Sequence, residues 1–343
     1  MGVSSNPYSR SCRDGINTTR GVQKIDVTPN EAELRLDQWF KRRFPELTFG
    51  RIAKWLRTGQ VRVDGKRSKP GDRLHAGQTV RVPPFAVFPA VSSPPIPVEE
   101  AETLRARVLH CDARVIALNK PANLAVQGGS KVQRHLDGML DALRFDAKER
   151  PLLVHRLDKD TSGVLLLARD QHAAKKLTAA FKNRETEKIY WALVVGVPRP
   201  RKGRIDLAVA KRSGRGGEKM AVDQEGGKPA LTEYAVINTA GSKVAWLELR
   251  PFTGRTHQLR VHMVSLGTPI LGDGKYGGQR AFIPRLSERL HLHARSIAVP
   301  HPDGGVLRVT SPLGYPMAES WATLGFDEDP EHGDSAIRSV HLE

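Results

Sequence analysis

The sequence predicts an α+β protein with two domains, and three observations support this prediction. The chain has 343 residues, which exceeds the usual size of a single domain. Its second part contains many short strand patterns and few helical ones. Six prolines lie within residues 83–97, and such a stretch is typical of a semi-rigid linker between domains.

The expected organisation has five segments, which follow from these shifts in pattern and composition. They are a flexible tail at 1–30, a small α+β module at 31–84, a proline-rich linker at 85–104, a larger domain at 105–325 with a mixed, largely antiparallel sheet flanked by helices, and an acidic tail at 326–343.

The net charge of +17 favours a polyanionic partner, either nucleic acid or an anionic membrane. The longest apolar runs are only a few residues, so we expect no membrane contact. The first 20 residues contain no hydrophobic segment of the kind that marks a secretory signal. Cys12 and Cys111 lie far apart without a second Cys at a metal-binding spacing, which favours a reducing, cytoplasmic setting.

The small module begins with two predicted helices, "LRLDQWFKRRF" and "TFGRIAKWLRTG", in which apolar residues recur at helical spacing. The second helix is expected to end at Gly59. Next, "QVRVDGKR" predicts a hairpin around Asp64-Gly65, and "QTVRVP" predicts a further strand.

Basic residues dominate this module, with 13 Lys/Arg against 4 Asp/Glu between Leu34 and Pro84. Charge alone leaves two interpretations open, a surface that faces phosphates or simply solvated helix faces. The order of the motifs resembles the small RNA-binding module of ribosomal protein S4 over residues 34–83. This resemblance implies that the module holds folded RNA, and the candidate contacts are Arg51, Lys54, Arg57, Arg62, Lys66 and Arg67.

The larger domain is predicted from five strand patterns that alternate with a few helices, of which "DQHAAKKLTAAFKN" and "THQLRVHMVSLG" are the clearest. The strand patterns are "RVIALNK", "GVLLLAR", "KIYWALVVG", "KVAWLELRP" and "HARSIAVP". A basic segment at 199–219, with eight Lys/Arg against two Asp/Glu, is expected to form a mobile hairpin or loop. It could clamp RNA or simply be solvated.

The motif "HRLDKDTSG" places charged groups directly before the buried strand "VLLLA". A carboxylate at the edge of a core is partly desolvated, so Asp158 needs a guanidinium partner to stay ionised. Arg156 and the distant Arg260 are the candidates. The residues alone also allow a purely structural ion pair that fixes the loop.

The motifs "VHRLDKDTSGVLLLAR", "EKIYWALVVG", "GKPALTEY" and "GRTHQLRVHMVSLGTPILGDGKYG" resemble, in order and spacing, the RluA-type family of pseudouridine synthases over about residues 105–320. The resemblance implies isomerisation of uridine within RNA, with no cofactor. Asp158 corresponds to the catalytic aspartate, Tyr190 to the tyrosine that stacks on uracil, and Arg260 to the arginine that pairs with the aspartate. Flipping of the nucleotide out of the RNA is then required.

The same resemblance implies further substrate-binding positions. Arg156 corresponds to the arginine that enters the RNA stack, Leu259 contacts or underlies the base, and Arg255 binds phosphate or caps its loop. His155 and Lys120 belong to neighbouring motifs and are included as substrate-binding candidates.

Several other features carry less weight. Asp160 could pair with Asp158 in a hydrolase, but "DTSG" favours a turn role. "LGDGKYGG" lacks the spacing of a phosphate loop and is interpreted as turn chemistry. No third ligand accompanies the histidine pairs 257/262 and 291/293, so no metal is expected.

The sequence thus predicts an RNA pseudouridine synthase whose preferred substrate is large-subunit ribosomal RNA, with no obligate protein partner. Transfer RNA is an alternative substrate. The alternatives from other classes are a non-catalytic ribosome-assembly factor that only binds RNA, and a hydrolase of nucleosidic bonds.

Overall fold

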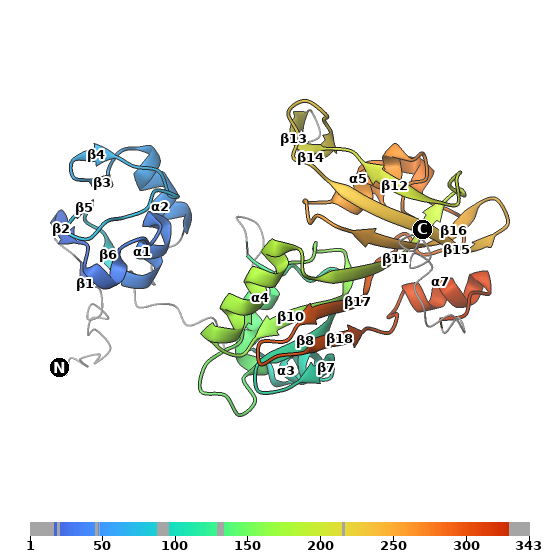
Figure 1. Cartoon of the computed structure of the whole chain (residues 1–343), viewed down its shortest axis with the longest axis horizontal. Coiled ribbons are helices and arrows are strands. Elements are labelled where there is room, and N and C mark those ends of the chain that lie inside the picture. Colours follow the sequence, from blue (N-terminus) through green and yellow to red (C-terminus); the bar gives the residue numbers. More distant parts are fainter. Residues whose placement is uncertain are drawn as a thin grey trace, which may run out of the picture. The chain divides into compact units, whose positions relative to one another are not determined.

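The computed structural model describes residues 17–18, 21–44, 47, 49–87, 96–128, 134–214 and 217–328. The chain forms two units, residues 1–95 and 96–343 (Figure 1). The division falls inside the expected linker. Of the acidic tail predicted at 326–343, residues 329–343 lie outside the described residues, as does Cys12. The tail does not begin at 326, because Phe326 is buried against Trp246 and Trp321 of the larger unit.

The smaller unit combines two helices with a four-stranded sheet of order β2-β5-β3-β4. Its elements are β1 (Asn17–Thr18), β2 (Gln23–Asp26), the 3-10 helix Pro29–Glu31, α1 (Leu36–Arg43), α2 (Phe49–Arg57), β3 (Arg62–Val63), β4 (Lys66–Arg67), β5 (Thr79–Val82) and β6 (Ala86–Val87). Both predicted helices and the hairpin are confirmed. Asp64 and Gly65 have φ of 48° and 76°, as a tight hairpin turn requires.

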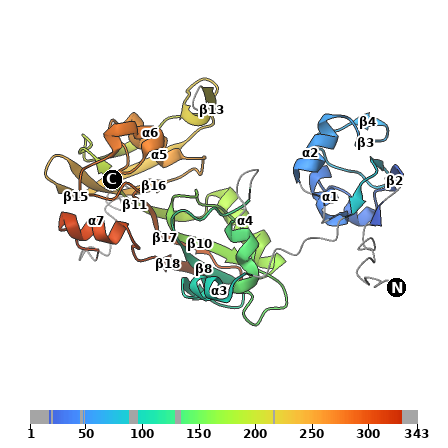
Figure 2. The same ribbon diagram turned by 180° about the vertical axis from the view of Figure 1, so that it is seen from behind.

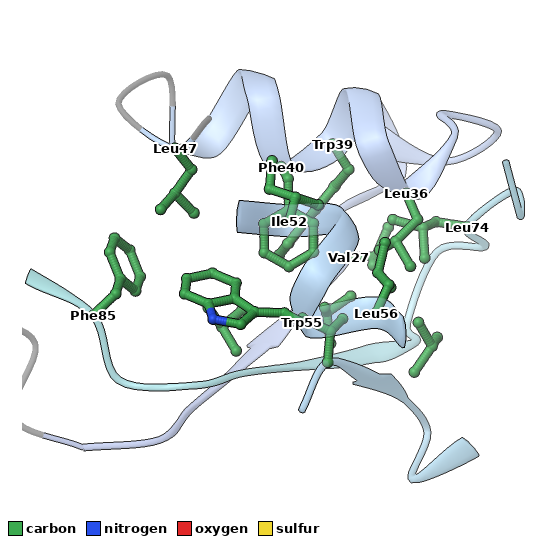
Figure 3. Packing of buried hydrophobic residues seen from close by; sticks show 14 residues of the cluster. Val27, Leu36, Trp39, Phe40, Leu47, Ile52, Trp55, Leu56, Leu74 and Phe85 are labelled. Atoms are coloured by element: carbon green, nitrogen blue, oxygen red, sulfur yellow. The ribbon is translucent and has the colours of Figure 1, made fainter. Parts of the chain in front are cut away.

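The core of this unit forms between the helices and the sheet (Figure 3). Trp39 and Phe40 of α1 are fully buried, and Ile52 and Trp55 of α2 belong to the same cluster, in which the Trp55 ring lies 5.6 Å from that of Phe85. The apolar spacing read from the sequence therefore marks the buried faces of both helices.

The unit starts earlier than expected. Strand β2 lies within the predicted tail, yet it pairs antiparallel with β5, from Gln23 opposite Val82 to Asp26 opposite Thr79. A tail over all of 1–30 is therefore wrong for residues 23–26. The linker is also shorter than predicted, because helix α3 (Val98–Arg105) buries Ala101 and Leu104 in the larger unit.

The larger unit is built on a ten-stranded sheet whose main path runs β12-β15-β16-β11-β17-β10-β8-β7. Strand β18 pairs with β17, and β9 pairs with β10. Among the described strands, β10 and β17 form the single parallel pair. The predicted mixed, largely antiparallel sheet is confirmed.

The strands of this sheet are β7 (Val108–Cys111), β8 (Val115–Lys120), β9 (Leu152–Leu153), β10 (Ser162–Ala168), β11 (Glu187–Val195), β12 (Lys202–Asp206), β15 (Leu231–Ala240), β16 (Val244–Pro251), β17 (Leu292–Pro300) and β18 (Val306–Thr310). The helices are α3, the 3-10 helix Leu136–Leu143, α4 (Gln171–Asn183), α5 (Gln258–Ser265), α6 (Gly274–Gly277), the 3-10 helix Gly278–Ala281 and α7 (Met317–Leu324).

The helices cover the sheet in separate hydrophobic clusters. Helix α4 begins at Asp170, whose side chain accepts a hydrogen bond from Ala173 N, and it packs on β8, β10 and β17. Helix α7 buries Trp321 against Trp246 of β16, with ring centroids 5.5 Å apart.

The basic segment 199–219 is more ordered than a loop. It contains β12, at one end of the main path of the sheet, and much of the hairpin formed by β13 (Val209–Gly214) and β14 (Gly217–Val222). Both views show this hairpin extending beyond the sheet (Figures 1 and 2). Lys211 pairs with Glu218 and Arg212 with Asp223, so part of its positive charge is neutralised.

Candidate active site

A cavity of about 510 Å³ opens in the middle of the larger unit. Four segments line it: the loop 155–158 before β10, the end of α4, the start of β11, and the segment 251–260 that joins β16 to α5. Cavities of this size accommodate small ligands such as a nucleoside. The motifs singled out in the sequence therefore converge on one site.

Asp158 supplies the only carboxylate among the described residues that line this cavity. Its side chain is 21 % exposed, and Oδ2 lies 3.8 Å from Nε2 of His257. The amide of Thr161 donates to the carbonyl of Asp158, which closes the turn that leads into β10. The motif thus presents a partly desolvated carboxylate at the end of a buried strand.

Asp160 does not line the cavity, although it lies two residues from Asp158. Two carboxylates facing one substrate are not present in the described part of the site. The structure therefore does not support the hydrolase alternative.

Tyr190 and Leu259 belong to the apolar lining of the cavity. Burial raises the pKa of Tyr190 well above its ordinary value, and the charge of Asp158 raises it further. The phenol is therefore protonated at neutral pH. Leu259 is buried on α5 and belongs to the same hydrophobic cluster as Tyr190, so both residues can contact or support a flat ring.

Arg260 does not form the expected ion pair with Asp158. Its guanidinium instead binds Asp273 with two hydrogen bonds, from Nε at 2.8 Å and from Nη2 at 2.6 Å. Both side chains are buried, and bidentate geometry makes this the better partner. Burial is the largest single effect on the pKa of Arg260 and lowers it, but the hydrogen bonds and the charge of Asp273, with a smaller contribution from the charge of Asp158, together raise this pKa above its ordinary value.

His257 is the neighbour of Asp158 that the sequence analysis missed, since it considered this residue only as a metal ligand. It has φ of 53° at the start of α5, and its Nδ1 lies 2.6 Å from the hydroxyl of Tyr276. That hydroxyl accepts a hydrogen bond from Met220 N. Burial lowers the pKa of His257, although the charge of Asp158 opposes this.

Asp273 and Tyr276 come from the segment that the sequence suggested was turn chemistry. Asp273 is the N-cap of α6 and accepts from the amide of Tyr276, and the Arg260 guanidinium lies 5.0 Å from the centre of the Tyr276 ring. The available signal was an Asp-Gly step at a helix start. It does not identify the partner of a distant arginine.

Lys120 does not line the cavity, so direct substrate contact is not supported. Its ammonium group is fully buried and donates to the carbonyls of Pro121, Leu124 and Lys159, at 2.8, 2.9 and 3.1 Å. Burial lowers its pKa to about 7. Lys120 therefore ties the loop after β8 to the loop that carries Asp158.

The remaining cavity candidates differ in whether their side chains already form hydrogen bonds within the protein. Arg156 is exposed at the cavity. Nε of Arg255 donates to the carbonyl of Pro229 at 3.0 Å. Nε2 of His155 accepts from Leu166 N at 2.8 Å, its ring stacks on Phe181, and burial lowers its pKa to about 3. The imidazole of His155 is therefore neutral and lines the cavity, and its Nε2 cannot accept a hydrogen bond from a substrate because Leu166 N already occupies it.

The basic candidates of the smaller unit lie on α2 and the β3–β4 hairpin. Lys54, Arg57, Arg62, Lys66 and Arg67 are exposed. The guanidinium of Arg51 lies 5.3 Å from the centre of the Trp55 ring. Arg62 also donates to the carbonyls of Gly59 and Gly65, which stiffens the hairpin.

The other buried histidines have structural bonds. His262 lies 2.9 Å from Thr232 Oγ1, and His291 lies 2.8 Å from Ser320 Oγ. In the described ranges, no three His, Cys, Asp or Glu side chains gather where they could hold a metal ion. None of the helices described there combines the length and apolar character needed to span a bilayer.

A cavity with one carboxylate, an aromatic ring and several cations, in a chain that also carries a basic module, defines an enzyme that acts on a polyanion. Residues 114–265 match the family model of RNA pseudouridylate synthase, and residues 34–80 match that of the S4 domain. The chain belongs to the RNA pseudouridylate synthase family. Both resemblances inferred from the motifs are confirmed.

Curated relatives match most of the chain. The ribosomal large subunit pseudouridine synthase C of Rickettsia typhi is 37 % identical over 280 residues, which cover 80 % of this chain and 91 % of the relative. The protein of the same name from Escherichia coli (strain K12) is 35 % identical, covering 86 % and 94 %. The solved structure of human RNA pseudouridylate synthase domain containing 4 has a TM-score of 0.57 and 32 % identity, covering 66 % of this chain and 96 % of that one.

Proposed function

We propose that this enzyme isomerises specific uridines of large-subunit ribosomal RNA to pseudouridine in the cytoplasm, with Asp158 as the catalytic group. Relatives that match four fifths or more of the chain carry the name of large-subunit enzymes. The S4 domain supports a structured RNA as the substrate, because a second binding site raises the effective concentration of RNA at the cavity.

The observation that carries the assignment of Asp158 is that, among the described residues, it is the only carboxylate that lines the cavity, together with Tyr190. The reaction breaks the bond between N1 of uracil and C1′ of ribose, turns the base, and joins its C5 to the same C1′. The proton on C5 is then lost to a base, and N1, freed by the cleavage, takes up a proton, so that the product is an isomer of uridine. An ionised carboxylate suits the first step, as it does in retaining glycosidases.

The target nucleotide must leave the RNA stack before it can reach Asp158, and this costs a few kcal/mol of stacking. Tyr190 offers a ring that can stack on the flipped uracil, and Leu259 supports it from α5. Exposed Arg156 is suitably placed to fill the gap left in the RNA.

Two residues act on Asp158 from nearby. His257 is its closest charged or titratable neighbour among the described ion-pair contacts. Arg260 is held by Asp273, so it stabilises the carboxylate through its field rather than through a direct bond. Arg260 places a positive charge near the carboxylate of Asp158, and His257 can offer it a hydrogen-bond donor.

The test is the Asp158→Asn variant, assayed for pseudouridine in an unmodified large-subunit transcript. We expect no pseudouridine and nearly unchanged, salt-dependent RNA binding. Asp160→Asn is the matched control and should retain most activity. Normal pseudouridine formation by Asp158→Asn would refute the assignment.

Mapping pseudouridines in total RNA with and without the protein tests the substrate. Pseudouridines that appear in large-subunit RNA only when the protein is present would support the proposal. If they appeared only in transfer RNA, the proposed substrate would be wrong and transfer RNA would be the substrate. Release of free uracil would indicate a hydrolase. RNA binding by the wild type without any pseudouridine would indicate a binding factor.

A further inference from the structure

The cavity carries far more positive than negative charge. Six Arg or Lys side chains line it against the single carboxylate of Asp158: Arg156, Lys182, Arg184, Lys188, Arg255 and Arg260. Asp273 neutralises Arg260, but three of the others, from the end of α4 and the start of β11, have no carboxylate partner among the described residues. These three are Lys182, Arg184 and Lys188.

The nearby acids are engaged elsewhere. Glu187 lies 3.3 Å from Arg250 and 3.8 Å from Arg308. Glu185 accepts a hydrogen bond from Asn183 Nδ2 at 3.1 Å. In the part of the chain that the structure describes, Arg184 and Lys188 have no ion pair within 4.0 Å.

Lys188 is half-buried on β11, which is an unfavourable place for an unpaired ammonium group. Burial lowers its pKa, and the neighbouring charge of Arg184 lowers it further. The charge of Lys188 in turn helps to lower the pKa of His155, after the larger effect of burial. The packing of the fold gives no reason for a cation here.

Arg184 stands at a position that favours glycine. It is the C-cap of α4 with φ of 62° and ψ of 30°, a left-handed conformation that is strained for a residue with a side chain. The negative end of the helix dipole favours cations such as Lys182 and Arg184. It does not explain Lys188, which lies on a strand.

We propose that Arg184 and Lys188, with Lys182 at the rim, form a subsite for a backbone phosphate of the RNA strand next to the nucleotide in the cavity. Lys188 and Tyr190 lie two residues apart on β11 and line the same cavity, so roughly 7 Å of strand separates a phosphate contact from the base contact. Phosphate contacts of this kind set the register of a strand without reading its sequence. The inference rests on the proposed RNA substrate.

The test uses the full-length chain with Arg184→Gly and Lys188→Met. Binding of an unmodified large-subunit transcript is measured across salt concentrations, together with KM, kcat and the thermal midpoint. Each variant should weaken binding roughly tenfold and make the slope of log K against log salt shallower by about 0.7. KM should rise while kcat changes little.

Stability separates this role from a structural one. Arg184→Gly relieves a left-handed backbone and Lys188→Met removes an unpaired buried charge, so neither thermal midpoint should fall. The control is Lys175→Met, which removes the same charge from an exposed position on α4 outside the cavity. It should change the salt slope much less.

Three outcomes would overturn the subsite: unchanged affinity and slope in both variants, an equal effect of Lys175→Met, or a lower thermal midpoint in both variants. These readouts need RNA binding but not catalysis. Loss of the proposed function, seen as RNA bound without pseudouridine formation, is therefore distinguishable from failure of the subsite.

Discussion

Arg260→Met is expected to destabilise the larger unit strongly, because it leaves Asp273 without its partner. The Asp273 side chain is fully buried, and it loses two charge-assisted hydrogen bonds of 2.8 and 2.6 Å. The amide of Tyr276, at 3.2 Å, remains as a donor. Breaking a buried pair in this way costs about 3–5 kcal/mol.

Calorimetry of the full-length chain measures the effect. A unit of this size shifts its thermal midpoint by about 2–4 °C per kcal/mol, so we expect a fall of roughly 6–20 °C. Arg255→Met is the control from the same loop, because Nε of Arg255 donates only to a carbonyl. Its cost should be about 1 kcal/mol.

The double variant Arg260→Met/Asp273→Leu tests the cause. It removes both charges, so it should be clearly more stable than Arg260→Met alone. A single variant that loses less than about 1 kcal/mol, or a double variant no more stable than the single one, would refute the reasoning.

Three further variants or conditions test other parts of the larger unit. Gly163→Ala should lower its thermal midpoint, because Gly163 has φ of 106° and a Cβ there would lie 2.2 Å from the carbonyl oxygen of Ala294; an unchanged midpoint would contradict the close approach of β10 and β17. Lys120→Met should lower kcat more than it raises KM, because it frees the loop that carries Asp158; kinetics in which only KM changes would point to substrate contact instead. Burial lowers the pKa of His291 and His293 to about 4, so the unfolded chain binds more protons between about pH 4 and 6.5. The free energy of unfolding should therefore rise with pH through that window and reach its full value above it. Urea midpoints measured at several pH values check this trend, and His291→Gln should make the dependence of the midpoint on pH weaker.

Local patterns correctly predicted the two helices of the smaller unit and five central strands of the larger one. Trp39, Phe40, Ile52 and Trp55 recur at helical spacing and are all buried. The five strand patterns of the larger domain became β8, β10, β11, β16 and β17. These segments are predictable because burial on one or both faces imposes a regular apolar pattern.

Strand β2 and helix α3 were missed for different reasons. β2 has the sequence QKID with one apolar residue, so its pairing with β5 depends on a partner more than fifty residues away. Helix α3 follows Pro97 at the end of a proline-rich stretch and opens with Glu99 and Glu100, which obscured its few apolar positions.

The sequence predicted which residues form the site better than it predicted which of them pair with one another. Asp158, Tyr190 and Arg260 were placed by motif, but the sequence cannot say which of two carboxylates a buried guanidinium will bind. Arg260 pairs with Asp273 because Asp273, at the start of α6, presents both carboxylate oxygens to the guanidinium in bidentate geometry. Such choices depend on tertiary structure and leave no local signal.

The separate hydrophobic cores make the chain modular. Every residue of the first core lies between Val27 and Phe85, whereas the other clusters begin at Ala101. A destabilising substitution in the first core can therefore weaken RNA binding by the smaller unit while the larger unit remains folded. Because the cores are separate, the smaller, RNA-binding unit can be replaced during evolution without changes to the larger, catalytic unit.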